Sequence, residues 1–207
     1  MNKIFFIGIL FFASTAFAKG IHFKLSHGQA DSGRWRHRPR LGAPVGVFTN
    51  RRQFEMHPAT VPSITEVRIL YQKAPFDENF CKELVEILSA FTEKNNPLYL
   101  GYKASGTMMM AKHVMNPFSK LSYFNKGKKM LELAIEADRK NIELRFLRFE
   151  AQTHIPSFLG YKENIEEDKK FLLDSFSKIT DKALNDFMRP ALLKSGYLTA
   201  SEKQQLK

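Results

Sequence analysis

The chain has 207 residues, a hydrophobic fraction of 43% and a formal net charge of +11. This length accommodates one ordinary domain, and the composition supports a packed core, which excludes a chain that is disordered throughout. The charge is unevenly distributed, because residues 19–62 contain eight Lys or Arg and only two acids.

Residues 1–18 predict a secretory signal peptide. Lys3 gives a positively charged start, residues 4–12 form an apolar run too short to span a bilayer, and residues 16–18 are an A-x-A cleavage site. An uncleaved membrane anchor is the alternative. We expect an exported mature chain, in a periplasm or outside the cell, with no transmembrane span after cleavage.

Residues 19–62 predict a flexible basic segment. They contain five Gly and four Pro without sustained apolar periodicity, so they bury too little apolar surface to offset the entropy of ordering. The basic tract inside this segment is a candidate polyanion site, because Arg pairs with phosphates and Trp stacks or inserts. An exported protein meets anionic lipid or polysaccharide rather than nucleic acid; a solvated basic tail is the alternative. The candidate residues are Arg34, Trp35, Arg36, Arg38 and Arg40.

Residues 63–198 predict an all-α domain of about seven helices. Apolar residues recur there at spacings of three and four, and residues with capping side chains precede each periodic run. The predicted starts are Ser63, Asp77, Asn96-Pro97, Asn116-Pro117, Asn141, Asn164 or Glu163, and Asp181. The second helix is expected to reach about Lys94, and the polar residues 199–207 are expected to form a frayed tail.

The predicted helix from Asn141 to His154 is apolar on most sides, so we expect it to be central. Its polar stripe is Arg145, Arg148 and Gln152. On a concave face of curved hairpins, this stripe lines a groove for an acidic peptide or a carboxylate-bearing ligand. The same groove includes Tyr99, Tyr102 and Lys103 one hairpin earlier. The alternative is that the arginines form interhelical salt bridges with Glu166, Glu167 or Asp168.

Motifs of catalysis are missing from the sequence, which contains no P-loop, no H-E-x-x-H and no G-x-S-x-G. The six His are scattered, so neither a metal site nor a cofactor is expected. Cys81 is predicted to be a buried small hydrophobe. The three methionines at 108–110 indicate core packing or, alternatively, an adaptable binding patch. We therefore expect a protein that is not an enzyme, with a small-ligand or enzymatic role for the Arg145/Arg148 face as the alternative.

Residues 117–151 resemble part of a tetratricopeptide repeat. Gly127, Leu131 and Ala134 have the spacing of that repeat's second helix, whereas Arg139 replaces its Pro. The runs NNPLYLGYK, NPFSKLSYFNKGKKMLELAIEAD, IELRFLRF and PSFLGYKENIEEDKKF are also similar to those of a group of small exported bacterial proteins of uncharacterised function. The tetratricopeptide resemblance implies stacked antiparallel helical hairpins, whereas the exported group implies no activity. From the hairpin architecture we expect a protein or peptide interaction module in the bacterial envelope.

Overall fold

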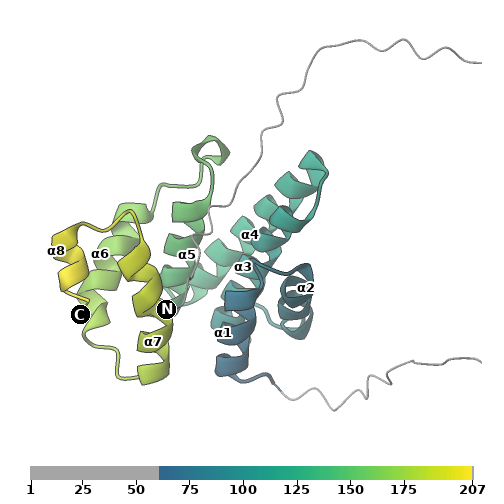
Figure 1. The fold of residues 1–207 in the computed structure, drawn as a ribbon. Helices are drawn as coiled ribbons and strands as arrows, with labels where there is room; N and C mark the ends of the chain where they lie inside the picture. Colours follow the sequence, from purple (N-terminus) through teal and green to yellow (C-terminus); the bar gives the residue numbers. More distant parts are fainter. Residues whose placement is uncertain (1–60, 207) are drawn as a thin grey trace, which may run out of the picture. The chain divides into compact units, whose positions relative to one another are not determined.

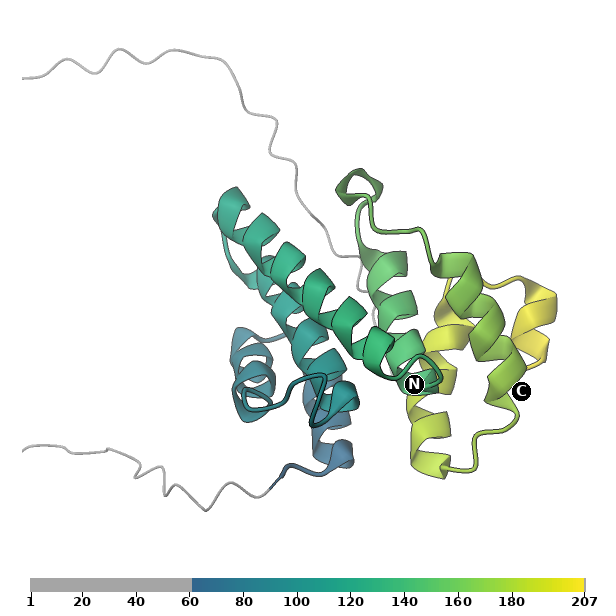
Figure 2. The same cartoon turned by 180° about the vertical axis from the view of Figure 1, so that it is seen from behind.

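A computed structural model describes residues 61–206 of the chain (Figures 1 and 2). The predicted signal peptide and the candidate polyanion site at Arg34, Trp35, Arg36, Arg38 and Arg40 lie outside the described residues. Within the described range the secondary structure is helical and contains no strand, which confirms the all-α class. The elements are α1 (Ile64–Lys73), α2 (Glu78–Ile87), α3 (Pro97–His113), α4 (Pro117–Ala137), α5 (Ile142–His154), the short 3₁₀ helix η1 (Ser157–Leu159), α6 (Ile165–Phe176), α7 (Lys182–Lys194) and α8 (Ala200–Gln204).

The starts of α1 to α7 lie where the capping residues predict them. Ser63 and Glu66 form a reciprocal capping box at α1. At five later helices, the side chain before the first helical residue accepts a hydrogen bond from a backbone amide of the first turn, which satisfies a donor that has no partner within the helix. These residues are Asp77, Asn96, Asn116, Asn141 and Asp181.

Helix α2 ends at Ile87, so the predicted extension to Lys94 is wrong. After Ile87, side chains form the hydrogen bonds with backbone amides and carbonyls that further helical turns would otherwise form. The Asn95 side-chain oxygen, Oδ1, accepts a hydrogen bond from the Thr92 backbone amide at 2.7 Å. Lys103 Nζ donates to the backbone carbonyl oxygens of Ser89 and Phe91 at 2.7 and 3.3 Å. A local sequence pattern does not predict the contact with Lys103, which lies on another helix.

The frayed tail predicted at residues 199–207 is also corrected within the described residues. Thr199 and Glu202 form a second capping box, which starts α8. Leu206 beyond α8 is only 1% exposed and joins the hydrophobic core. The polar composition of residues 199–207 gave no apolar periodicity from which to predict this helix. A single apolar residue, Leu206, anchors the segment to the core.

Helix α3 is the most enclosed element, with eleven of its 17 residues buried, compared with seven of 13 in α5. It packs against α1, α2, α4 and α5. The contact with α4 is close because Gly127 has no side chain: a Cβ there would lie 2.6 Å from the carbonyl oxygen of Ala104. The prediction that α5 is central is thus right in part, since α3 is more central still.

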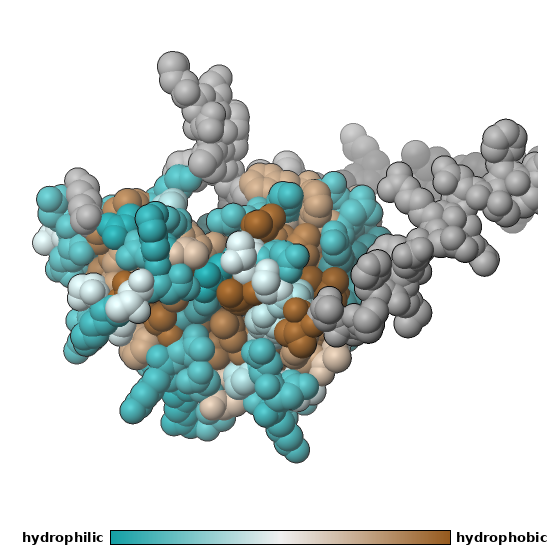
Figure 3. Space-filling model, turned by 90° about the horizontal axis from the view of Figure 1, so that it is seen from below, coloured by the Kyte–Doolittle hydropathy of each residue, from teal (hydrophilic) through white to brown (hydrophobic). Residues whose placement is uncertain are grey.

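The remaining helices extend this core to one side. Figures 1 and 2 both show α6, α7 and α8 grouped beside α5, away from α2. Seen from below in Figure 3, hydrophilic residues dominate the periphery, and hydrophobic residues lie between them near the middle. Among the described helices, none has the length and apolar character needed to cross a membrane.

Candidate functional site

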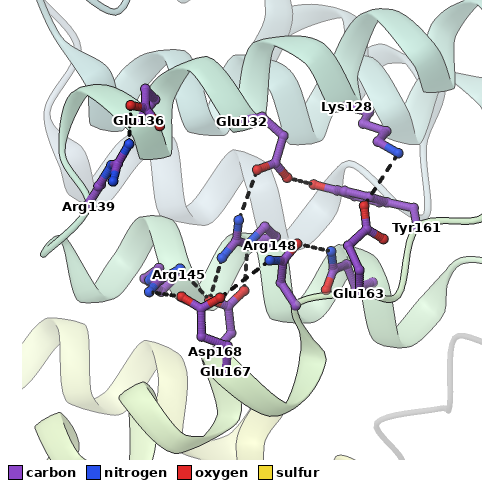
Figure 4. A network of polar contacts seen from close by, with 12 residues as sticks. Lys128, Glu132, Glu136, Arg139, Arg145, Arg148, Tyr161, Glu163, Glu167 and Asp168 are labelled. Atoms are coloured by element: carbon purple, nitrogen blue, oxygen red, sulfur yellow. Dashed lines mark hydrogen bonds and ion pairs between the residues drawn. The ribbon is translucent and has the colours of Figure 1, made fainter.

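The predicted arginine stripe lies on a network of carboxylates (Figure 4). Arg148 makes a bidentate contact with Asp168, with Nε–Oδ2 at 2.7 Å and Nη2–Oδ1 at 2.8 Å. Its Nη1 donates to Glu132 at 2.9 Å. Arg145 contacts Glu167 at 2.5 Å and Asp168 at 3.0 Å. The alternative of interhelical salt bridges is therefore the arrangement found, and it joins α5 to α4 and α6.

The other residues predicted for the same partner-binding face make structural contacts. Tyr102 and Gln152 are fully buried, and Tyr102 donates to the Glu143 carboxylate. The Tyr99 hydroxyl donates to the carbonyl oxygen of Pro62 at 2.6 Å, and Lys103 holds the turn after α2. Gln152 Nε2 donates to Asn164 at 3.2 Å. The expectation that these side chains share one exposed face is corrected, because Tyr102 and Gln152 are buried and the other two make structural contacts.

A polar hollow of about 270 Å³ remains beside the network. Three arginines and three glutamates contribute to its lining, so their formal charges cancel. A balanced set of charges gives no net attraction for an acidic peptide. Its lining residues are Glu132, Ile135, Glu136, Arg139, Arg145, Arg148 and Glu167.

A second cavity is apolar and has a volume of about 170 Å³. It opens where the C-terminal ends of α1, α3 and α5 meet. Helical spacing explains its walls, because residues separated by three, four and seven positions share one face of a helix. Such a set on α3 is Ser105, Met108, Met109 and Lys112; on α5 it is Leu147, Glu150, Ala151 and His154. Tyr71, Gln72, Pro75, Ala111, Phe124 and Ile155 complete the lining.

Glu150 is the notable polar group in this cavity. Its side chain is 17% exposed, and His154 Nδ1 lies 4.0 Å from its carboxylate. No hydrogen bond to the Glu150 carboxylate is found in the described part of the chain. Removal from water disfavours the ionised form, so burial raises the pKa of Glu150 above its ordinary value.

The other polar groups around Glu150 are neutral or already make contacts elsewhere. Burial, and secondarily the charge of Glu150, raise the pKa of the Tyr71 phenol, which keeps it neutral. Lys112 Nζ is held by the Pro75 carbonyl oxygen at 2.5 Å, and His154 Nδ1 lies 2.7 Å from the carbonyl oxygen of Glu150 itself. The Ser105 hydroxyl donates to Gly101 in its own helix at 3.0 Å. The Glu150 carboxylate is therefore the group that these contacts leave open to a ligand.

Glu150 and Tyr71 were not predicted to be site residues. The available signal was an acid between Leu147 and Ala151 on one face of α5. Of the three consecutive methionines, Met108 and Met109 line the cavity and Met110 is buried. All three belong to or pack against the hydrophobic core, which confirms the interpretation as core packing, and the adaptable binding patch stays a prediction.

The other singled-out residues have structural roles. Cys81 is fully buried, its Sγ lies 3.2 Å from the carbonyl oxygen of Gly106, and burial raises its pKa to about 12. This confirms the interpretation as a small hydrophobe. Residues 61–206 contain no group of three or more His, Cys, Asp or Glu placed to hold a metal ion.

Comparison with known proteins gives no relative: neither a protein-family model, nor a curated protein, nor a solved structure matches this chain.

Proposed function

We propose that this chain is an exported, non-enzymatic binding protein of the bacterial envelope that holds a small organic amine in the apolar cavity. The observation that carries the proposal is the Glu150 carboxylate, which is partly buried against apolar side chains and has no hydrogen-bonded cation among the described residues. A charge in such a place is costly unless it is paired. A ligand ammonium supplies the missing partner.

Helix geometry favours the same charge. The partial negative charge of a helix dipole lies at its C-terminus, where cations are stabilised. The helices α1, α3 and α5 end at Lys73, His113 and His154, next to the residues that line the cavity. Three such ends surround the cavity, so the backbone and Glu150 both favour a positive ligand.

The apolar lining of the cavity determines the size and the apolar character of the part of the ligand that carries no charge. An apolar cavity of roughly 150 Å³ accepts a benzene-sized molecule, and this one has about 170 Å³. Phe124, Met108 and Tyr71 supply aromatic and polarisable surface for one ring with a short side chain. A binding role fits better than a catalytic one, because the cavity hydroxyl of Ser105 is bonded within its own helix.

The helical framework is proposed to be a degenerate tetratricopeptide-like array of hairpins. Gly127, Leu131 and Ala134, which match the repeat's spacing, are all buried on α4. The pairs α3–α4 and α5–α6 pack closely, as the two helices of a repeat do. The proposed ligand cavity then lies between successive hairpins rather than on a concave peptide-binding face.

The test is a titration of the chain from Lys19 onwards with phenethylamine and with phenethyl alcohol, which has the same shape without the charge. We expect the amine to bind more tightly and the Glu150→Gln variant to lose about tenfold in amine affinity, the loss of one charge-assisted hydrogen bond. Amine affinity should rise as pH increases through the pKa of Glu150, because only the ionised carboxylate pairs with an ammonium.

Two variants control this experiment. Glu83→Gln removes an exposed acid of α2 outside the cavity and should leave the affinity unchanged. Ala151→Leu fills the cavity and should weaken both the amine and the alcohol. The proposal is contradicted if phenethylamine and phenethyl alcohol bind with equal affinity and Glu150→Gln does not change the amine affinity.

A further inference from the structure

The turn between α3 and α4 exposes large hydrophobic side chains. Met115 in the turn is 92% exposed, Phe118 in the first turn of α4 is 83% exposed, and Leu121 is 47% exposed. Phe76, in the loop between α1 and α2, is 61% exposed. Large apolar side chains that are gathered on a surface mark an interaction site.

Two contacts hold these loops together at one end of the domain. His113 Nε2 lies 3.0 Å from the carbonyl oxygen of Ala74. Lys112 Nζ bonds the Pro75 carbonyl oxygen and lies 5.9 Å from the centre of the Phe76 ring. The end of α3 is therefore fixed against the α1–α2 loop, so Phe76 is presented beside the turn that carries Met115 and Phe118.

The charge at this end is positive. Residues 112–131 contain five Lys and neither Asp nor Glu. Lys126 and Lys129 are exposed, eight and eleven residues after Phe118, which places them near its side of α4. Of the acids beside Phe76, Glu78 is paired with Lys82 at 2.7 Å, and Asp77 caps α2.

We propose that this end of the domain docks on an anionic phospholipid surface. Met115, Phe118 and Phe76 enter the interfacial region, and the lysines of α4 contact the lipid headgroups. A basic helix with apolar residues at its tip combines hydrophobic burial with attraction to anionic lipid. The patch projects from a turn and is flanked by lysine, which suits a lipid surface better than a concave protein partner. This surface is separate from the proposed amine cavity and does not depend on it.

The experiment measures co-sedimentation of the chain from Lys19 onwards with vesicles. We expect binding to phosphatidylcholine vesicles with about 30% phosphatidylglycerol, little binding to phosphatidylcholine alone, and weakening by salt. Met115→Ser/Phe118→Ser should reduce the affinity at least about tenfold through lost apolar burial. Lys126→Gln/Lys129→Gln should also reduce it about tenfold.

Matched variants identify the docking surface. Leu133→Ser changes an apolar residue of α4 that is 42% exposed but far from the turn, and should have no effect. Phe118→Trp in a Trp35→Phe background should show a blue-shifted emission on anionic vesicles only. The proposal is overturned if Met115→Ser/Phe118→Ser binds like wild type. It is also overturned if neutralising Arg34, Arg36, Arg38 and Arg40 abolishes binding while the α4 variants do not alter it.

Discussion

Glu150 is the residue on which the proposed amine site rests. Its carboxyl lies among apolar side chains, and burial raises its pKa. Groups with such shifts are concentrated at functional sites, where binding compensates for their cost. The residue should therefore leave a signature in the pH dependence of stability without any ligand.

We predict that Glu150→Gln increases stability at neutral pH. Above the ordinary pKa of 4.5 and below the raised value, the folded chain keeps a proton that the unfolded chain has lost. Wild-type stability therefore falls as pH rises through this interval. Glutamine cannot ionise, so the variant should not lose stability in this interval. The unfolding free energies of the two proteins should become equal below pH 4.5.

Urea unfolding as a function of pH measures this difference. Glu83→Gln, which alters an exposed acid, should follow the wild-type curve. A Glu150→Gln variant that is less stable than wild type at neutral pH would show that the carboxylate is stabilised in a way that the structure does not contain.

The sequence predicted part of the residue-level arrangement. For Arg145 and Arg148, interhelical salt bridges to Glu166, Glu167 or Asp168 were the stated alternative, and the structure pairs them with Glu167 and Asp168. Glu150 was not recognised, since its surroundings come from Tyr71 and Met108 on helices distant in sequence. Periodicity shows which residues share a face, but not which other face they meet.

At the scale of elements, helix starts were more predictable than helix ends. A start depends on a local side chain, such as Asn116, that bonds amides two and three residues onward. The end of α2 depends instead on Lys103 from another helix. The beginning of α8 was missed despite its local signature, Thr199 and Glu202, because the surrounding residues are polar.

The α3–α4 pair gives a prediction at this scale. Gly127→Ala should destabilise the protein by about 2 kcal/mol, because overpacking outweighs the gain of roughly 1 kcal/mol in helix propensity. The added Cβ would lie 2.6 Å from Ala104 O and 2.9 Å from Met108 N, and backbone atoms cannot rotate away as a side chain can. Thermal or urea unfolding measures the loss.

Gly196→Ala is the matched control for this change. A Cβ at this position would meet no atom within 4 Å, and the φ of Gly196 is not in the left-handed region. Alanine there should be neutral or should stabilise by up to about 1 kcal/mol through the unfolded state. Equal effects at the two glycines would contradict the close contact between α3 and α4.

For the whole molecule, α5 connects the earlier helices to the later ones through two buried charge networks. Glu143 at its start accepts two hydrogen bonds of 2.8 Å from Arg68 of α1. Arg148, about one and a half turns later, binds Asp168 of α6 and Glu132 of α4. The all-α class was predictable from patterning, and the Arg148–Asp168 pair was one stated alternative. The contacts with Arg68 and Glu132 were not predicted, because the network joins pairs that are 16 to 75 residues apart.

The final prediction concerns this connection. Arg148→Met should destabilise the fold by about 3 kcal/mol, because removing one partner leaves the buried Asp168 carboxylate short of compensation. Arg145, at 3.0 Å, retains part of the pairing and keeps the loss at the lower end of the usual range. Arg148→Met/Asp168→Leu should cost less than the single change, since apolar residues can replace a buried ion pair.

Arg139→Met separates this effect from a general loss of charge. Arg139 pairs with Glu136 at the surface, where its side chain is 69% exposed, so its removal should change stability by no more than about 1 kcal/mol. Urea unfolding of these three variants and of Asp168→Leu tests the ordering. If the double variant is as unstable as the sum of its two single variants, Arg148 and Asp168 are not coupled, and α5 does not join α6 through this pair.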